Sequence, residues 1–163
     1  MAQKKSVYIE TSVVSYLTAH PTNDLLAAAW QKTTVDWWET QRQRFLLFTS
    51  GVVVEEARRG NPEAASRRLR ALSDIPVLAI TEGVVALSKA LIRDGALPPK
   101  ALDDSLHIAL SAVHEIDYLL TWNCRHIDNA ETKPIVRRVC AAHGYSGSEI
   151  CTPQELMGVI ENG

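Results

Sequence analysis

Hydrophobic positions along the chain alternate between short runs of strand length and longer stretches with helical spacing. Such alternation is typical of βαβ units, in which helices connect the parallel strands of one sheet. Five short apolar runs predict strands at residues 7–9, 45–49, 77–80, 118–121 and 149–151. The pattern therefore predicts an α/β fold built on a parallel, five-stranded sheet.

The stretches between these runs predict helices, and Gly or Pro marks most of their ends. The expected helices follow Asn23, run from about residue 50 to Gly60, start at Asn61 and Pro62, cover 82–94, 102–114 and 132–143, and begin at Pro153. No repeat, low-complexity linker or boundary divides the chain. We expect a single domain over residues 1–163, a length that suits one fold.

The helix after Asn23 carries an apolar stripe that includes two tryptophans. The residues at the spacing of this stripe are Leu26, Ala29, Trp30, Thr33 and Trp37. Tryptophans can stack RNA bases, and Trp38 and Trp122 are further candidates for that role. Because Trp30 and Trp37 fit a buried helix face, we expect these two in the core.

Composition restricts the cellular setting. The formal net charge of -2 excludes a protein that binds nucleic acid through overall basicity. Three cysteines, without an apolar leader, favour a reducing cytosol over a secreted disulfide scaffold. No apolar stretch reaches the roughly 18 residues of a membrane-spanning helix. We therefore expect a soluble, cytoplasmic protein with no membrane partner.

Polar residues stand at positions where the predicted sheet would expose a ligand crevice. Glu10 follows the strand 7–9, and Asn123 follows the strand 118–121. Glu56 belongs to the helix after the second strand, and Asp104 to the first turn of the helix at 102–114. Ligands bind parallel sheets at the carboxyl ends of strands, near the point where strand order reverses. We expect these four side chains to converge there.

Clustered carboxylates repel one another, and a hard cation relieves that repulsion. Oxygen ligands from Asp, Glu and Asn suit Mg²⁺ or Mn²⁺ better than Zn²⁺. Such a cation polarises a phosphoryl oxygen and lowers the pKa of a bound water, which then attacks phosphorus in line. The residues thus indicate phosphodiester hydrolysis.

Four segments in this order resemble the PIN-domain ribonucleases, which include the VapC-like toxins of type II toxin and antitoxin pairs. The segments are VYIETSVVSYL, TSGVVVEEARRG, DDSLHIALSA and LLTWNCRHI. The resemblance implies a three-layer α/β/α fold and a Mg²⁺- or Mn²⁺-dependent endoribonuclease that leaves a 5′-phosphate. It also implies an antitoxin partner and a homodimer, for which the helices after Asn23 are candidates. By motif match, Glu10, Glu56, Asp104 and Asn123 are the catalytic and metal-binding residues.

Two positions depart from that family's usual pattern. Glu10 stands where Asp is usual, and Asn123 stands where Asp is common, so the site carries less negative charge. We expect one firmly held ion rather than the pair of a two-metal enzyme. The same departures motivate an alternative, a catalytically weak or inactive PIN-like module that binds RNA or a protein partner.

Several neighbours compete for the same roles. Glu55 adjoins Glu56 but suits a solvated helix face, and Asp103 adjoins Asp104 but suits a plain helix cap. His107 shares a helix face with Asp104, and we interpret it as a structural, hydrogen-bonded histidine rather than a catalytic one. Thr11 and Ser12 are expected to orient Glu10, bind phosphate or cap a helix.

Two further sets of residues leave alternatives open. Arginines are candidates for contacts with an RNA backbone or an acidic partner, although helical arginines are commonly a solvated face. They are Arg58, Arg59, Arg67, Arg68, Arg70, Arg125, Arg137 and Arg138. Cys124, His126, Cys140 and His143 form pairs with loose zinc-ligand spacing. We favour Cys140 as a small buried apolar residue over a zinc ligand.

Overall fold

The structure is a computed structural model that describes residues 3–159. Within that range it contains five strands, seven α-helices and one short 3-10 helix. In chain order these are β1 (Lys5–Ile9), α1 (Thr11–Thr18), α2 (Leu25–Thr40), η1 (Arg42–Arg44), β2 (Phe45–Ser50), α3 (Gly51–Ala57), α4 (Pro62–Leu72), β3 (Val77–Leu78), α5 (Glu82–Arg93), α6 (Leu102–Val113), β4 (Tyr118–Leu120), α7 (Lys133–Ala142) and β5 (Glu149–Cys151). No helix among these residues has both the length and the apolar character needed to cross a membrane.

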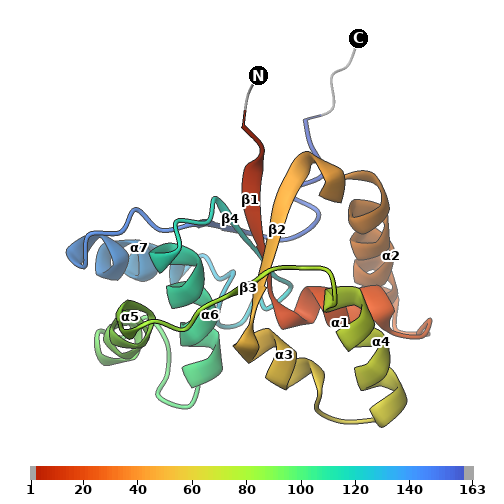
Figure 1. The fold of residues 1–163 in the computed structure, drawn as a ribbon, viewed down its shortest axis with the longest axis horizontal. Helices are drawn as coiled ribbons and strands as arrows, with labels where there is room; N and C mark the ends of the chain where they lie inside the picture. The colour runs from red at the N-terminus through yellow and green to blue at the C-terminus, as the bar shows by residue number, and fades with distance from the viewer. Residues whose placement is uncertain (1–2, 160–163) are drawn as a thin grey trace.

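The strands form one sheet in the order β3-β2-β1-β4-β5, and every neighbouring pair is parallel. Helices α1, α2 and α4 lie on one side of the sheet, and α5, α6 and α7 lie on the other (Figure 1). Helix α3 lies beyond the end of β2, where it contacts α1, α4 and α6. The α/β prediction of a three-layer fold with a central, parallel, five-stranded sheet is confirmed.

Strand β1 is the centre of the core. Its residues Val7, Tyr8 and Ile9 are all fully buried. Both faces of a parallel sheet are covered by helices, so its inner strands are apolar in continuous runs instead of alternating. This is why a short unbroken run, and not an alternating one, marks the central strand.

Strand order reverses beside β1. From β1 the chain moves outward to β2 and β3, then returns to the opposite side of β1 to place β4 and β5. The carboxyl ends of β1 and β4 therefore diverge into connections on opposite faces, which is where open α/β sheets bind ligands. The backbone N–H of Glu10 donates to the carbonyl of Leu120 at 3.2 Å, which ties the two strand ends together.

The predicted strand at 77–80 and the predicted helix from Pro153 differ from the structure. The strand at 77–80 contains only Val77 and Leu78, and Ile80 is exposed. The helix expected from Pro153 is wrong, since residues 153–156 form a turn. Gly158 has a φ of +94°, a left-handed conformation that ends any helix soon after it begins.

The buried stripe predicted for the helix after Asn23 is partly wrong. In α2 the inward face holds Trp30, Thr34 and Trp37, whereas Leu26 is 61% exposed and Ala29 is also exposed. This face of α2 points inward because Trp122 binds it. Trp122 stacks on Trp30 and donates through Nε1 to Thr34 Oγ1 at 2.7 Å. Trp37 is fully buried and Trp30 packs against the core, so the expected core role of both is confirmed.

In α6 the first residue, Leu102, is half exposed although it is apolar. The polar residues Ser105, His107 and Ser111 are buried. The reason is that α6 packs against the sheet on one side and α5 on the other, so that most of its circumference is covered.

Candidate functional site

Glu10 joins the end of β1 to the start of α1. Its backbone is extended, and its side chain caps α1 by accepting the N–H of Ser12 at Oε2 (3.0 Å). Its other oxygen, Oε1, accepts hydrogen bonds from the hydroxyls of Ser12 and Thr121, the latter at 2.6 Å. The side chain is buried, and a carboxylate is stable there because three donors and the amino end of a helix face it.

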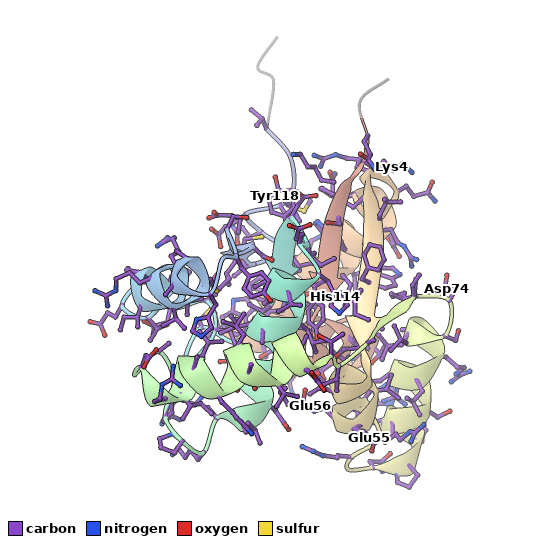
Figure 2. All side chains as sticks on the ribbon, turned by 60° about the vertical axis from the view of Figure 1, so that its left-hand side comes forward. Lys4, Glu55, Glu56, Asp74, His114 and Tyr118 are labelled. Carbon is purple, nitrogen blue, oxygen red and sulfur yellow. The ribbon has the colours of Figure 1, made fainter. Side chains whose placement is uncertain are left out.

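Glu56 is the acid that α3 turns toward the site. Ser50 caps α3 by accepting the N–H of Val53, which fixes the helix directly after β2. One oxygen of Glu56, Oε1, accepts from Thr11 Oγ1 at 2.7 Å and lies 2.6 Å from Nε2 of His107 on α6. Glu55 is exposed and pairs with Arg58 at 3.0 Å, so the two neighbouring acids point in different directions (Figure 2).

His107 is held at both ring nitrogens. Nδ1 lies 2.7 Å from the hydroxyl of Tyr8, and that hydroxyl lies 2.7 Å from Ser50 Oγ. With Nε2 beside Glu56, these contacts form a hydrogen-bonded chain that runs from the buried Ser50, Tyr8 and His107 to the half-buried Glu56. The residues come from β2, β1, α6 and α3, so this chain links α6 to α3 through two central strands of the sheet.

The ionisation of His107 and Glu56 is mutually reinforcing. Burial by itself lowers the pKa of His107, but its hydrogen bond to Glu56 and the charges of nearby carboxylates raise it above its ordinary value of 6.5. Burial by itself raises the pKa of Glu56, yet its bonds to His107 and Thr11, with the charge of Arg59, hold it below its ordinary value of 4.5. Each group therefore favours the charged form of the other, His107 as a proton-holding imidazole and Glu56 as a carboxylate.

We expect this pair to make the stability of the metal-free protein depend on pH. A histidine whose folded pKa is raised contributes full stability below its unfolded value, and that contribution is lost as the pH rises through the folded pKa. The free energy of unfolding, measured by urea titration in chelator, should fall as the pH rises above the ordinary histidine pKa of 6.5. In His107→Gln this fall should be smaller, and an identical profile in that variant would contradict the assignment.

Asp104 lies one helical turn before His107 and has its own two partners. Its Oδ1 accepts from the amide nitrogen of Asn123 at 3.2 Å, and its Oδ2 lies 2.9 Å from Nδ1 of His126. The amide oxygen of Asn123 accepts the backbone N–H of His126 at 3.0 Å. Asn123 thus shapes the turn after β4 and supports Asp104 at the same time.

Thr121 connects this second cluster to the first. Its hydroxyl donates to Glu10 and accepts the backbone N–H of Asn123 at 2.9 Å. A continuous hydrogen-bonded path therefore runs from Glu10 through Thr121 and Asn123 to Asp104. The four residues singled out from the sequence all lie around the carboxyl ends of β1 and β4.

Three of the side chains at this edge meet closely enough to share a cation. One ligand atom each from Glu10, Glu56 and His107 lies within 4.8 Å of the other two. Within residues 3–159, Oε2 of Glu56 receives no hydrogen bond, so it is the oxygen most open to a metal. Asp104 does not belong to this close group. The carboxylates fit Mg²⁺ or Mn²⁺, with His107 holding Glu56 in place.

Several functional neighbours escaped prediction from sequence. Tyr8 and Thr121 belong to apolar strand runs that indicate core packing, and His126 attracted notice only as a zinc candidate. Ser12 orients Glu10 as expected, whereas Thr11 binds Glu56. The cysteine and histidine pairs do not gather into a site within residues 3–159. Cys140 is buried, as expected of a small apolar residue, and His143 bonds to the carbonyl of Val139.

Comparisons with known proteins do not add an assignment. No protein-family model matches the chain, and a search of curated proteins gives no significant match. The functional argument consequently depends on the geometry of the chain itself.

Proposed function

We propose that this chain is a PIN-like, metal-dependent endoribonuclease that hydrolyses RNA phosphodiester bonds and acts as the toxin of a type II toxin and antitoxin pair. One observation carries the proposal. Acids from three separate elements, Glu10 after β1, Glu56 on α3 and Asp104 on α6, lie at the edge where the strand order of a parallel sheet reverses. These acids lie at the edge where such sheets bind ligands, and they belong to the segments that resemble PIN-domain ribonucleases. Together the two observations support a nuclease site over an acidic surface without a function.

Glu10 and Glu56 would hold Mg²⁺ or Mn²⁺, with Asp104 and Asn123 completing the site directly or through water. When bound, such a cation supplies Lewis-acid stabilisation of the negative charge that develops on the phosphate. The chain's own contribution is preorganisation, since each acid is fixed by two side-chain donors before substrate arrives. Ser12 and Thr121 serve Glu10, Thr11 and His107 serve Glu56, and Asn123 and His126 serve Asp104.

Cleavage of a mixed panel of structured and single-stranded RNAs tests the proposal. Parent protein should cut in Mg²⁺ or Mn²⁺, leave 5′-phosphate ends and stop cutting in chelator. Asp104→Asn keeps the shape of the side chain but removes its charge, and we expect cleavage to fall at least about tenfold. Folded parent protein, free of any partner, that cuts no RNA in either metal would overturn the nuclease assignment.

A non-catalytic module that binds RNA or a protein is the second candidate. The observation that favours it is the amide oxygen of Asn123, which accepts the backbone N–H of His126 and so is partly engaged before any metal arrives. Binding of RNA without cleavage, at equal affinity with and without Mn²⁺, would identify this alternative.

The proposed setting is the cytosol, with an antitoxin and a second copy of the chain as partners. Leu25 and Leu26, at the start of α2, are 89% and 61% exposed, which supports an interface on the helices after Asn23. Exposure of two adjacent leucines is costly for a surface that always faces water. The mass of the purified protein in solution tests the homodimer.

A further inference from the structure

Arg59 lies at the rim of the candidate site with a fixed backbone and a free side chain. It follows α3, three residues after Glu56, and its N–H donates to the carbonyl of Glu56 at 3.2 Å. Its own carbonyl accepts from Nη2 of Arg68, on α4, at 2.6 Å. Gly60, with a φ of +85°, then turns the chain toward α4. The base of the Arg59 side chain is therefore anchored, whereas the side chain is 67% exposed.

The guanidinium of Arg59 extends from the end of α3 to α6. Its Nη2 lies 3.6 Å from Oδ2 of Asp103, the neighbour of Asp104. Asp103 therefore does not act as the plain cap expected from the sequence, and α6 has no side-chain cap. A separation of 3.6 Å is beyond good hydrogen-bond geometry, and exposed ion pairs contribute little stability. This pairing holds Arg59 weakly and leaves it free to exchange Asp103 for another anion.

Arg58 provides a contrast within the same chain segment. It is 59% exposed and makes a 3.0 Å pair with Glu55 on the solvent side of α3. The guanidinium of Arg59, in contrast, lies beside Asp103, the neighbour of Asp104 at the start of α6. Two adjacent arginines of similar exposure thus differ in whether their side chains extend toward α6 or along α3.

An RNA strand entering this site meets the carboxylates of Glu10, Glu56 and Asp104, which repel its phosphates. A cation at the rim offsets that repulsion, and the planar fork of arginine matches two phosphate oxygens. We propose that Arg59 is a substrate-binding residue that leaves Asp103 to contact a backbone phosphate of single-stranded RNA at the rim of the site. This inference rests on the proposed nuclease function, and it names the substrate contact of that site.

Binding of a short, fluorescently labelled single-stranded RNA to the full chain tests the inference. The titrations use Ca²⁺ in place of Mg²⁺ and a series of KCl concentrations, and a gel verifies that the RNA stays intact. Arg59→Ala should bind about 5- to 10-fold more weakly, and its slope of log K against log salt should be shallower by about 0.7. Arg59→Lys keeps the charge and should restore the slope, with an intermediate affinity.

Arg58→Ala is the matched control, and it should change RNA affinity less than about twofold. Asp103→Asn should tighten binding in the parent background and do so less in Arg59→Ala, because part of its effect is the release of Arg59. Equal salt slopes for parent and Arg59→Ala overturn the inference and leave the nuclease proposal intact. If polyglutamate displaces RNA as well as a phosphate polymer does, the rim is a site for acidic protein instead. Parent protein that binds no RNA at low salt overturns both proposals.

Discussion

Replacing Glu56 with glutamine should reduce metal-dependent RNA cleavage at least about 100-fold, whereas Glu55→Gln should leave it within about twofold. Glutamine has nearly the size and shape of glutamate but carries no charge. The change therefore removes the open oxygen of the site as an anionic ligand and also the partner of His107. Initial rates with a cleaved RNA, across a range of Mn²⁺ concentrations, provide the measurement.

The neighbouring control makes this comparison sharp. Glu55 and Glu56 lie on the same short helix, and their substitutions change the net charge equally. A general effect of charge on RNA binding would appear in both variants, but loss of a ligand would appear only in Glu56→Gln. Equal losses in the two variants, or full activity in Glu56→Gln, would contradict the assignment of Glu56. Calorimetric titration with Mn²⁺ adds a readout that is independent of turnover.

The largest effect on stability is expected at His107. His107→Ala removes a fully buried ring and leaves Tyr8 and Glu56 without one of their partners. The cavity and the unmet hydrogen bonds together should lower the free energy of unfolding by about 3–5 kcal/mol. Urea denaturation of the metal-free protein near neutral pH measures this loss.

Tyr8→Phe provides the second corner of a double-mutant cycle. Loss of the Tyr8 hydroxyl alone should cost about 1–2 kcal/mol, because Ser50 and His107 each lose a buried partner. The double variant should lose at least about 0.5 kcal/mol less stability than the sum of the two single losses, because both changes break the same hydrogen bond. Strict additivity would show that the contact between Tyr8 and His107 carries no stability.

The sequence was sufficient to predict the architecture because the sheet is parallel and covered on both faces. Burial of β1 on both sides requires the unbroken run at Val7 to Ile9, and such a run cannot be mistaken for an alternating surface strand. The edge strand β3 was predicted too long because its apolar residues extend to Ile80, which faces solvent. At the edge of a sheet, the apolar character of a residue does not indicate where its strand stops pairing with the neighbouring strand.

The sequence was sufficient to predict the polar residues of the candidate site but not the residues that hydrogen-bond to them. Glu10, Asp104 and Asn123 follow strand ends or open a helix, so the order of elements alone places them at one edge. The role of His107 depends on Tyr8 and Glu56, which lie 99 and 51 residues away along the chain. Spacing along one helix cannot reveal those partners. Likewise, the direction of the Asn123 amide is set by the turn to His126, which residue type does not determine.

The position of Thr121 has a consequence for synthesis of the protein. Thr121 bonds to Glu10 from 111 residues further along the chain, and β4 is the neighbour that closes the central strand. A ribosome that has released only the residues before β4 has delivered Glu10 but not the strand whose Thr121 fixes it. Glu10 can therefore take its final position only after β4 has been synthesised. Under the proposed ribonuclease function, late placement of Glu10 would keep the growing polypeptide harmless to the messenger and transfer RNA around it.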